Sequence, residues 1–270
     1  MKKGLLKRIF CLLIVATIGI SIAGCGGGET MKRIEKTGKL VVGTSGDYAP
    51  YEYHMLVDGK DTIVGIDISI VEEIAKDMGV QFQIVDADFN GLLSSLNTNK
   101  VDIVIAGMNP DEKRKKSVDF SKIYYEAKQG VMVRAEDKDK YKTVADLKDK
   151  KVGAQLGTTQ EKIVQEQIKG ANLVSLGKIP DLVMELKNKK IDALVVELPV
   201  ASGYVKNNND LALTNVPVKD DTGGSAIAVK KGNSNLVDKI NKTLDRLMKD
   251  GLIEKFVQEA NEKNVTSKSK

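Results

Sequence analysis

Residues 101–107 read VDIVIAG, a run in which only Asp102 interrupts the apolar side chains. A strand with one face in water alternates apolar and polar residues, whereas a strand covered by helices on both faces is apolar almost throughout. We therefore predict a buried strand over Val101–Ala106 and, from it, an α/β fold with a largely parallel sheet.

The chain on either side of this run alternates short apolar segments with segments that carry apolar residues at helical spacing. In the segment 67–78, for example, Val71, Ile74 and Met78 fall on one helical face. Pro199 suits the first turn of a helix, and Ser234 suits the cap of the longest one. The pattern predicts strands over 39–43, 81–85, 151–155, 172–176, 191–196 and 225–230, and helices over 67–78, 91–98, 160–168, 181–187, 199–206 and 234–249.

Two parts of this series share a spacing. Residues 96–102, LNTNKVD, match residues 186–192, LKNKKID, and each segment closes a predicted helix and opens an apolar strand. Coincidence is the alternative, because such turns are common before strands, but we favour two similar α/β lobes. Ligands of open α/β sheets sit beyond the carboxyl ends of the strands. The clusters expected to face one cleft are therefore 44–48, 107–114, 157–160 and Glu197.

The first residues have the pattern of an export signal. Four cations precede an apolar run over Ile9–Ala23, whose length of 15 residues falls short of the roughly 20 that a bilayer core requires. The end of the run, IAGC, resembles the lipobox of bacterial lipoproteins, in which the cysteine is lipidated and becomes the first mature residue. We predict a signal peptide over 1–24, a lipidated Cys25 with a tether over 25–34, and a location on the extracytoplasmic face of the bacterial cell membrane. A plain signal peptide with a chance cysteine is the alternative.

The composition argues against several classes of protein. Without the signal only Cys25 remains, so neither a disulfide nor a cysteine-based metal site is expected, and the single histidine, His54, argues against a zinc site. The net charge of +5 falls to +1 without the four signal cations, which gives no basis for nucleic-acid binding. No nucleotide-binding or hydrolase motif occurs, so we expect no cofactor and assign ATP hydrolysis to another subunit.

The predicted cleft contains partners for a zwitterion, which leaves water readily only where both its charges are met. Arg114 has the planar fork that binds a carboxylate, and it follows a strand-to-helix junction where free N–H groups also favour an anion. Thr158 and Thr159 add donors from the second lobe, and Glu197, at the end of an apolar strand, suits an ammonium group. The alternatives are a solvated cation for Arg114 and a helix-start acid for Glu197.

Five segments of the chain resemble the substrate-binding proteins of ABC importers for polar amino acids, the bacterial extracellular solute-binding proteins of family 3. They are LVVGTSGDYAPYEY, VGIDISIVEEIA, KVDIVIAGMNPDEKRKKSVDFSKIYY, KVGAQLGTTQE and KIDALVVELPVASGY, in the order of that family. The resemblance implies a two-lobed α/β fold of the periplasmic-binding-protein type II, with two hinge strands and a central cleft. Lobe 1 would comprise 35–125 and 222–270, lobe 2 would comprise 126–221, and the hinges would fall near Tyr125–Glu126 and Asp221–Thr222.

The resemblance also assigns roles by position. Arg114 would bind the α-carboxylate and Glu197 the α-amino group, while Tyr48 and Phe89 would flank the side chain; core packing is the alternative for any single aromatic residue. The other residues placed at the ligand are Ser45, Gly107, Met108, Asn109, Thr158, Thr159 and Gln160, of which Gly107, Asn109 and Thr159 would add hydrogen bonds. Three positions depart from the usual pattern, because Asn109 replaces serine or threonine, Ser45 replaces an aspartate of many glutamine and cationic-ligand binders, and Glu197 replaces the commoner aspartate.

We expect the protein to bind a polar amino acid and to deliver it to an ABC permease with its ATPase subunit, as a monomer and without catalysis. Two flanking aromatic rings suit a long, flat-ended side chain, which ranks arginine or lysine first, glutamine second and small polar residues third. Asp47, Glu52 and Asp88 are candidates for a distal acid. The alternatives of other classes are a dehydratase on the same fold, with Glu197 as its acid, and a sensor domain fused to a membrane helix.

The predicted lipidation of Cys25 determines how the protein should partition between detergent and water. The wild-type chain, expressed in a bacterium, should enter the detergent phase of a phase separation, because an acyl chain contributes about 0.8 kcal/mol for each buried methylene. Cys25→Ser should leave the protein unprocessed or in the aqueous phase. Immunoblots of the two phases measure this, and wild-type protein in the aqueous phase would rule out the anchor.

Overall fold

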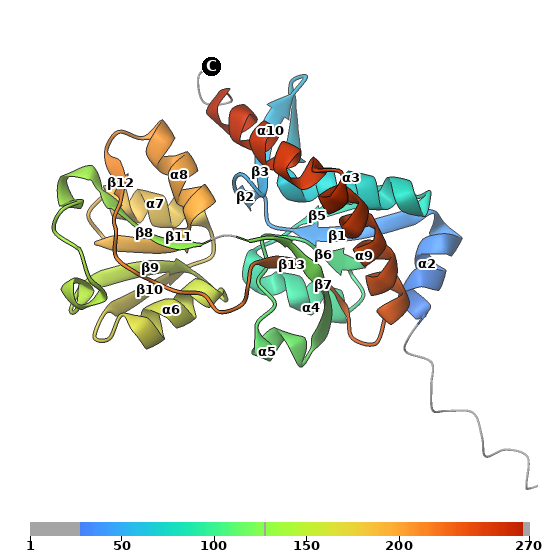
Figure 1. Cartoon of the computed structure of the whole chain (residues 1–270), viewed down its shortest axis with the longest axis horizontal. Coiled ribbons are helices and arrows are strands. Elements are labelled where there is room, and N and C mark those ends of the chain that lie inside the picture. The colour runs from blue at the N-terminus through green and yellow to red at the C-terminus, as the bar shows by residue number, and fades with distance from the viewer. Residues whose placement is uncertain (1–27, 127, 267–270) are drawn as a thin grey trace, which may run out of the picture.

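The computed structural model describes residues 28–126 and 128–266, and within them the chain forms two lobes (Figure 1). Each lobe is built on a five-stranded sheet. The chain passes between the lobes twice, once between β7 (Val118–Tyr125) and β8 (Gln129–Arg134), and once between β12 (Leu211–Leu213) and β13 (Ser225–Lys230). The two-lobed α/β fold predicted from the sequence is confirmed. The predicted signal peptide and Cys25 lie outside the described residues.

The first lobe contains the run that opened the sequence analysis. Its sheet has the order β5-β1-β6-β13-β7, in which β1 (Lys39–Thr44) pairs in parallel with β5 (Gln81–Asp86) and with β6 (Ile103–Val104). Strand β6 is shorter than predicted because ladder pairing is confined to two residues, although the Ile105 N–H still donates to the Gly43 carbonyl at 3.1 Å.

The side chains of this run alternate between two buried clusters. Ile103 and Ile105 pack in the cluster that includes α3 (Ile66–Met78) and α9 (Ser234–Lys249), whereas Val104 and Ala106 pack in the cluster formed with α4 (Leu92–Asn97). Helices therefore cover both faces of the strand, which is the physical reason for its unbroken apolar sequence.

The second lobe repeats the parallel part of the first. Its sheet has the order β10-β9-β11-β8-β12, and β9 (Lys151–Gln155) lies between β10 (Asn172–Leu176) and β11 (Ala193–Glu197), parallel to both. In each lobe the first strand of the three is therefore the central one. Contacts join the lobe 2 sheet to three helices, namely α6 (Thr159–Gln167), α7 (Ile179–Lys187) and α8 (Leu198–Asn207).

The sequence repeat 96–102 and 186–192 corresponds to a repeated structural device. The Asp102 N–H donates to the Val41 carbonyl at 2.7 Å, and the Asp102 carboxylate accepts from the Val41 N–H at 2.8 Å. Asp192 makes the same pair of contacts with Lys151, at 2.7 and 2.9 Å. In both lobes an aspartate thus pairs with an N–H and a carbonyl of the neighbouring strand, which fixes the position of the strand that follows the aspartate.

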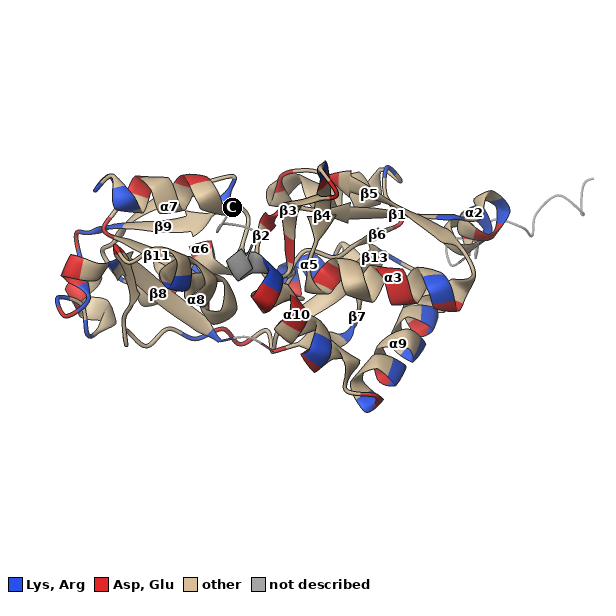
Figure 2. Ribbon diagram, turned by 90° about the horizontal axis from the view of Figure 1, so that it is seen from above, with Lys and Arg blue, Asp and Glu red and all other residues tan. Residues whose placement is uncertain are grey.

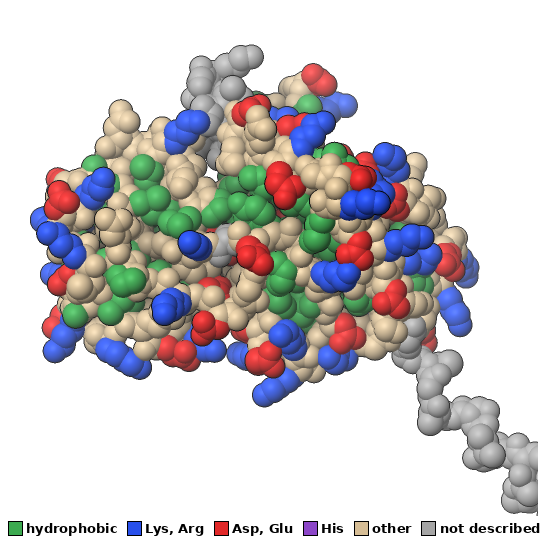
Figure 3. Space-filling view, in the orientation of Figure 1, with side chains coloured by type: hydrophobic (Ala, Val, Ile, Leu, Met, Phe, Trp, Pro, Cys, Tyr) green, Lys and Arg blue, Asp and Glu red, His purple; other side chains and the backbone are tan. Residues whose placement is uncertain are grey.

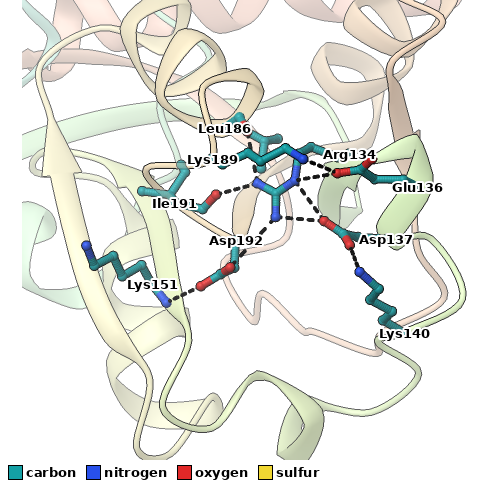
Figure 4. A network of polar contacts seen from close by, with 9 residues as sticks. All are labelled: Arg134, Glu136, Asp137, Lys140, Lys151, Leu186, Lys189, Ile191 and Asp192. Atoms are coloured by element: carbon teal, nitrogen blue, oxygen red, sulfur yellow. Dashed lines mark hydrogen bonds and ion pairs between the residues drawn. The ribbon is translucent and has the colours of Figure 1, made fainter.

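An arginine reinforces this device in each lobe. Arg33 pairs with Asp102, and Arg134 lies 3.7 Å from Asp192 (Figure 4). The Arg134 guanidinium also donates to the carbonyls of Leu186 and Ile191, at 3.0 and 2.7 Å. It therefore ties the end of α7 to the start of the segment that becomes β11.

A third, antiparallel sheet was not predicted. It consists of β2 (Asp47–Tyr48), β3 (Glu52–Val57) and β4 (Lys60–Val64). Gly65 follows it at φ 133°, and a Cβ on this residue would lie 2.2 Å from the Tyr51 carbonyl oxygen. Only glycine tolerates that approach, which lets the start of α3 dock on the segment that carries Tyr51.

Two boundary predictions were wrong. The tether expected over 25–34 overlaps α2 (Glu29–Thr37), where Met31 and Ile34 are buried and therefore hold the segment against lobe 1. Ser234 is the first residue of α9 rather than its cap, and Asn233 occupies the cap position. The remaining elements are the short helix α5 (Glu112–Lys115), α10 (Leu252–Thr266) and 3₁₀ turns over Phe89–Gly91, Ala135–Asp137 and Val144–Leu147.

Charge is distributed over the surface without a dominant sign. Lysines, arginines and carboxylates alternate along the outer helices (Figure 2), and both signs surround the apolar side chains on the face seen in Figure 3. Within the described residues, no helix combines the length and the apolar character that crossing a membrane requires.

Candidate functional site

The strand-end clusters predicted to face one cleft meet where the two lobes touch. Lobe 1 contributes the segments that follow β1 and β6, and lobe 2 contributes the segment after β9 together with the last residue of β11. Hydrogen bonds join the two sets directly, which shows that the clusters face each other across the lobe contact.

Arg114 is a buried cation at this contact, with 8% of the residue exposed. Asp111 caps α5 and accepts from the Arg114 backbone N–H at 2.7 Å, which fixes the side chain's origin. The guanidinium donates to the Asn109 carbonyl at 2.6 Å and, across the lobes, to the Gly157 carbonyl at 2.9 Å. Burial lowers its pKa, and Asp111 opposes this effect, but a guanidinium stays charged in proteins.

Phe89 lies against Arg114. The guanidinium carbon is 5.2 Å from the centre of the Phe89 ring, a distance typical of a cation–π contact. Phe89 is thus held in place by Arg114, the residue predicted to bind a carboxylate. Both residues line a cavity of about 700 Å³ between the lobes, together with Met108 and Thr158.

Glu197 is fully buried at the end of β11. Its carboxylate accepts from the Tyr51 hydroxyl at 2.5 Å and from the Asn109 amide at 3.3 Å, both of which belong to lobe 1. Burial raises the pKa of Glu197 to about 7, although the bonds from Tyr51 and Asn109 act to lower it. A nearby cation would therefore find a carboxylate that is half ionised at neutral pH and is stabilised further by the added charge.

Asn109 joins the predicted residues of the two lobes. Besides Glu197, it contacts Thr159, whose hydroxyl lies 3.1 Å from the Asn109 amide oxygen. The Thr159 hydroxyl also lies 3.2 Å from an Asp220 carboxylate oxygen, and because it carries one hydrogen it donates to one of these acceptors at a time. Thr159, at the start of α6, can therefore donate either to Asn109 of lobe 1 or to Asp220, next to the predicted hinge.

Gln160 lies in a chain of amides behind Thr159. Its amide donates to the Gln129 side-chain oxygen at 2.9 Å, and Gln129 in turn donates to Asp220 at 3.0 Å. Gln129 and Asp220 were not predicted. Asp220 adjoins the predicted hinge at 221–222, and that position is the only signal in the sequence that points to it.

Tyr51 is the most important residue that the sequence analysis missed. Its ring is fully buried and stacks on Tyr48, with centroids 5.4 Å apart and an angle of 20° between the planes. Tyr48 is therefore backed by a second aromatic ring, and the Tyr51 hydroxyl reaches Glu197. The repeat of tyrosine after three positions, YAPY, was the available signal.

Ser45 and Gly107 lie at the site but already have partners inside lobe 1. The Ser45 hydroxyl donates to the buried Glu52 carboxyl at 3.1 Å, and the Gly107 N–H donates to the buried Asp67 carboxylate at 2.9 Å. Asp67 thus engages the Gly107 N–H, and the hydrogen bond expected between Gly107 and a ligand stays a prediction.

Glu52 and Asp67 form a buried acidic pair behind the site. Burial, followed by the neighbouring Asp67, raises the pKa of Glu52 well above its usual range. Burial also raises the pKa of Asp67 to about 6, although the Gly107 N–H and the Tyr124 hydroxyl stabilise its charge. Glu52 thus lies behind Ser45, whose hydroxyl donates to it, and burial disfavours its ionised form.

Asp47 and Asp88, the other candidates for a distal acid, lie together. They line a cavity of about 230 Å³ with Ser45, Asp86 and Lys178. Burial raises the pKa of Asp47 to about 6, while the Ile179 N–H at 3.3 Å and the Gln155 amide at 3.4 Å, both from lobe 2, act to lower it. The three carboxylates outnumber the Lys178 ammonium and the His54 imidazole that line the same cavity, so this end of the site is acidic.

Metal coordination has no support from the side chains. Within residues 28–126 and 128–266, no three histidine, cysteine, aspartate or glutamate side chains are grouped so that they could hold an ion.

Comparisons with known proteins identify similar sequences and a similar structure. A sequence profile of the bacterial extracellular solute-binding proteins, family 3, matches residues 40–261. The arginine-binding extracellular protein ArtP of Bacillus subtilis (strain 168) is 40% identical over 254 residues, which cover 93% of this chain and 96% of ArtP. The glutamine-binding protein GlnH of the same strain is 31% identical over 265 residues, covering 91% and 94% of the two chains. An amino acid ABC transporter substrate-binding protein of Streptococcus pneumoniae, solved bound to L-arginine, superposes with a TM-score of 0.84 at 38% identity over 86% of this chain and 98% of that one.

The hydrogen bond from Tyr51 to Glu197 should contribute more to stability when Glu197 is ionised. Tyr51→Phe keeps the ring and removes the donor, so at about pH 8 we expect a loss of roughly 1.5–3 kcal/mol, the range for bonds to charged groups. At about pH 5, below the Glu197 pKa of about 7, the loss should be smaller. Urea denaturation at both pH values measures it. Tyr53→Phe, which removes a bond to the neutral Ala260 carbonyl, is the matched control; equal losses for both variants at both pH values would contradict the assignment.

Proposed function

The chain belongs to the bacterial extracellular solute-binding proteins of family 3, and from this premise we propose that it captures a cationic amino acid, arginine before lysine, and delivers it to an ABC importer. The observation that carries the proposal is the pair Arg114 and Glu197, two opposite charges buried at one lobe contact. A free amino acid presents the complementary pair on adjacent atoms, and removing it from water requires both partners.

Arg114 is the proposed partner of the α-carboxylate. The guanidinium has donors in a planar fork, and a carboxylate that replaced the Gly157 carbonyl as acceptor would pair two opposite charges where the carbonyl offers only a neutral acceptor. Phe89 supports the guanidinium from one face, and Thr158 and Thr159 stand at the start of α6, where N–H groups favour an anion.

Glu197 is the proposed partner of the α-ammonium. Its raised pKa reflects a carboxylate that burial disfavours, and an ammonium beside it would restore the ionised form. Asn109 holds the carboxylate from lobe 1 and would accept a further bond through its amide oxygen. Because Glu197 would be ionised and engaged by the ammonium, it has no role as a general acid, so we propose binding without catalysis.

The acidic cavity supports a cationic side chain. Asp47, Asp86 and Asp88 face Lys178 there, and the raised pKa of Asp47 leaves a carboxylate that a guanidinium would stabilise. Tyr48, stacked on Tyr51, offers a flat surface beside Ser45. The arginine named for ArtP and for the Streptococcus structure agrees with this choice. Glutamine is the alternative, supported by GlnH and by the neutral Ser45 hydroxyl.

The remaining parts of the proposal concern location and partners. The family is extracellular, and the IAGC sequence supports a lipid anchor at Cys25 on the extracytoplasmic face of the membrane. The proposed lobes, 35–125 with 222–270 and 126–221, would close on the ligand as a monomer and present it to a permease with its ATPase subunit.

Arg114 should be essential for affinity. Arg114→Ala removes the proposed carboxylate partner and should weaken arginine binding by at least about 3 kcal/mol, roughly a hundredfold. Isothermal titration calorimetry measures the dissociation constant. Lys116→Ala is the matched control, because it removes an exposed cation two positions away, outside the interlobe cavity, and should leave affinity within about twofold. Wild-type-like binding by Arg114→Ala would refute the assignment.

Asp47 should determine the preference for a cationic side chain. Arginine, then lysine, should raise the melting temperature most among the twenty amino acids, because a ligand of the folded state stabilises it by mass action. Asp47→Asn should weaken arginine binding about tenfold and glutamine binding much less, since only the cation loses a charge-assisted bond. The exposed Asp139→Asn is the control. If excess arginine and lysine fail to displace bound glutamine, the ranking of ligands is wrong.

A further inference from the structure

His54, the only histidine of the chain, lies between two carboxylates. Its Nδ1 is 2.9 Å from an Asp61 carboxylate oxygen on β4, and its Nε2 is 3.1 Å from an Asp86 carboxylate oxygen at the end of β5. A neutral imidazole has one N–H and one lone pair, so it would turn a lone pair toward one of the two acids. Only the imidazolium donates to both, and the geometry therefore selects the protonated ring.

The ring is packed on the segment that carries three proposed ligand residues. A Cβ at Gly46 would lie 2.7 Å from two atoms of the His54 ring, so the ring lies directly against the Gly46 backbone. The His54 backbone N–H donates to the Gly46 carbonyl at 3.3 Å. Gly46 stands between Ser45 and Asp47, and Tyr48 follows, so the ring is in contact with the segment that begins the site.

Asp86 connects the same segment to a second one. While one of its oxygens faces His54, the other accepts from the Gly46 N–H at 2.9 Å. Asp86 leads through two residues to Phe89, the residue beneath the Arg114 guanidinium. His54, Asp86 and Gly46, called here the His54 clamp, thus join the segments that carry Tyr48 and Phe89.

We propose that His54 is a positioning residue whose protonated form closes the His54 clamp and holds the two aromatic-bearing segments in the geometry that binds the ligand. The inference rests on the proposed function for its consequence, a ligand affinity that decreases as His54 loses its proton. It makes the affinity of the site sensitive to pH through a residue that lines the cavity proposed for the ligand's side chain and acts on the segments beside it.

The charges around the ring favour the proton. The charged groups that face His54 or line the cavities it borders are Asp47, Asp61, Asp86, Asp88, Lys178 and Lys187, and the titratable hydroxyls there belong to Tyr53 and Tyr204. Partial burial lowers the pKa of His54, but the contacts with Asp86 and Asp61 outweigh it, so the pKa is raised above its ordinary value of 6.5. The stabilisation is therefore fully present below pH 6.5 and is lost as pH rises through the raised value.

The first experiment tests the clamp without a ligand. Because the chain has one histidine, the imidazole Cε1–H signal in an NMR titration belongs to His54. Its midpoint should lie above 6.5 and should fall in Asp86→Asn, and the Gly46 amide should titrate with the same midpoint. A midpoint at or below 6.5, or a Gly46 amide that does not respond, would overturn the clamp.

The second experiment tests the consequence with L-arginine as the probe. Calorimetry between about pH 6 and pH 8.5 gives the affinities of the wild type and of His54→Gln. In their ratio, the pH dependence that comes from groups common to both proteins, such as Glu197 and Asp47, cancels. The ratio of wild-type to variant affinity should fall about threefold to fivefold as pH rises, a modest effect because the ring is partly exposed. His54→Arg carries a positive charge over this whole pH range, so it should bind L-arginine more tightly than His54→Gln at every pH.

The outcomes separate this inference from the proposed function. A constant affinity ratio, or one that rises with pH because the imidazolium repels the bound cation, would overturn the positioning role. If L-arginine binds to no variant at any pH, the proposed function fails, whereas the imidazole and Gly46 titrations still decide whether the clamp exists. A melting temperature of His54→Gln that stays well above the temperature of the calorimetry at about pH 6 would exclude unfolding as the cause of any loss of affinity.

Discussion

The burial of Glu197 and Arg114 between two lobes is the constraint on which the rest of this structure depends. A charged group leaves water only where other groups replace its hydration. Each of these two is met from the opposite lobe, Glu197 by Tyr51 and Asn109, and Arg114 by the Gly157 carbonyl. Neither lobe alone therefore completes the site, and the contact between them is stabilised by the same polar groups that the proposed ligand would use.

The position of these charges follows from how the strands are fixed. In each lobe an aspartate forms hydrogen bonds with the backbone of the first parallel strand, Asp102 with β1 and Asp192 with β9, and an arginine pairs with that aspartate. A displacement along a strand by one residue would turn every side chain to the other face of the sheet. The repeated aspartate therefore sets which residues emerge at the strand ends, and so it sets where Glu197 lies relative to lobe 1.

The charge distribution within the site has two distinct parts. Near Glu197 and Arg114 opposite charges are balanced, whereas the far end is acidic, with Asp47, Asp86 and Asp88 against Lys178. Burial raises the pKa of Asp47, which means that its ionised form is disfavoured, and a bound cation would stabilise that form. The departure at Ser45 is consistent with this arrangement, because its hydroxyl donates to the buried Glu52 and neighbouring segments supply the negative charge instead.

The sequence by itself determined the parts that depend on local pattern or on chemical necessity. Apolar runs such as VDIVIAG specify strands because burial on both faces leaves no room for polar side chains, and the repeat around Asp102 and Asp192 marked two related lobes. Arg114 and Glu197 were identifiable because few residue types can accompany a buried zwitterion. The tertiary structure alone decided the partners of these groups. Tyr51 donates to Glu197 across 146 positions of the chain, and α2 became a helix where a tether was expected because lobe 1 buries Ile34. Such contacts depend on which surfaces meet once the whole chain has folded, and no local sequence pattern specifies a partner so far away in the sequence.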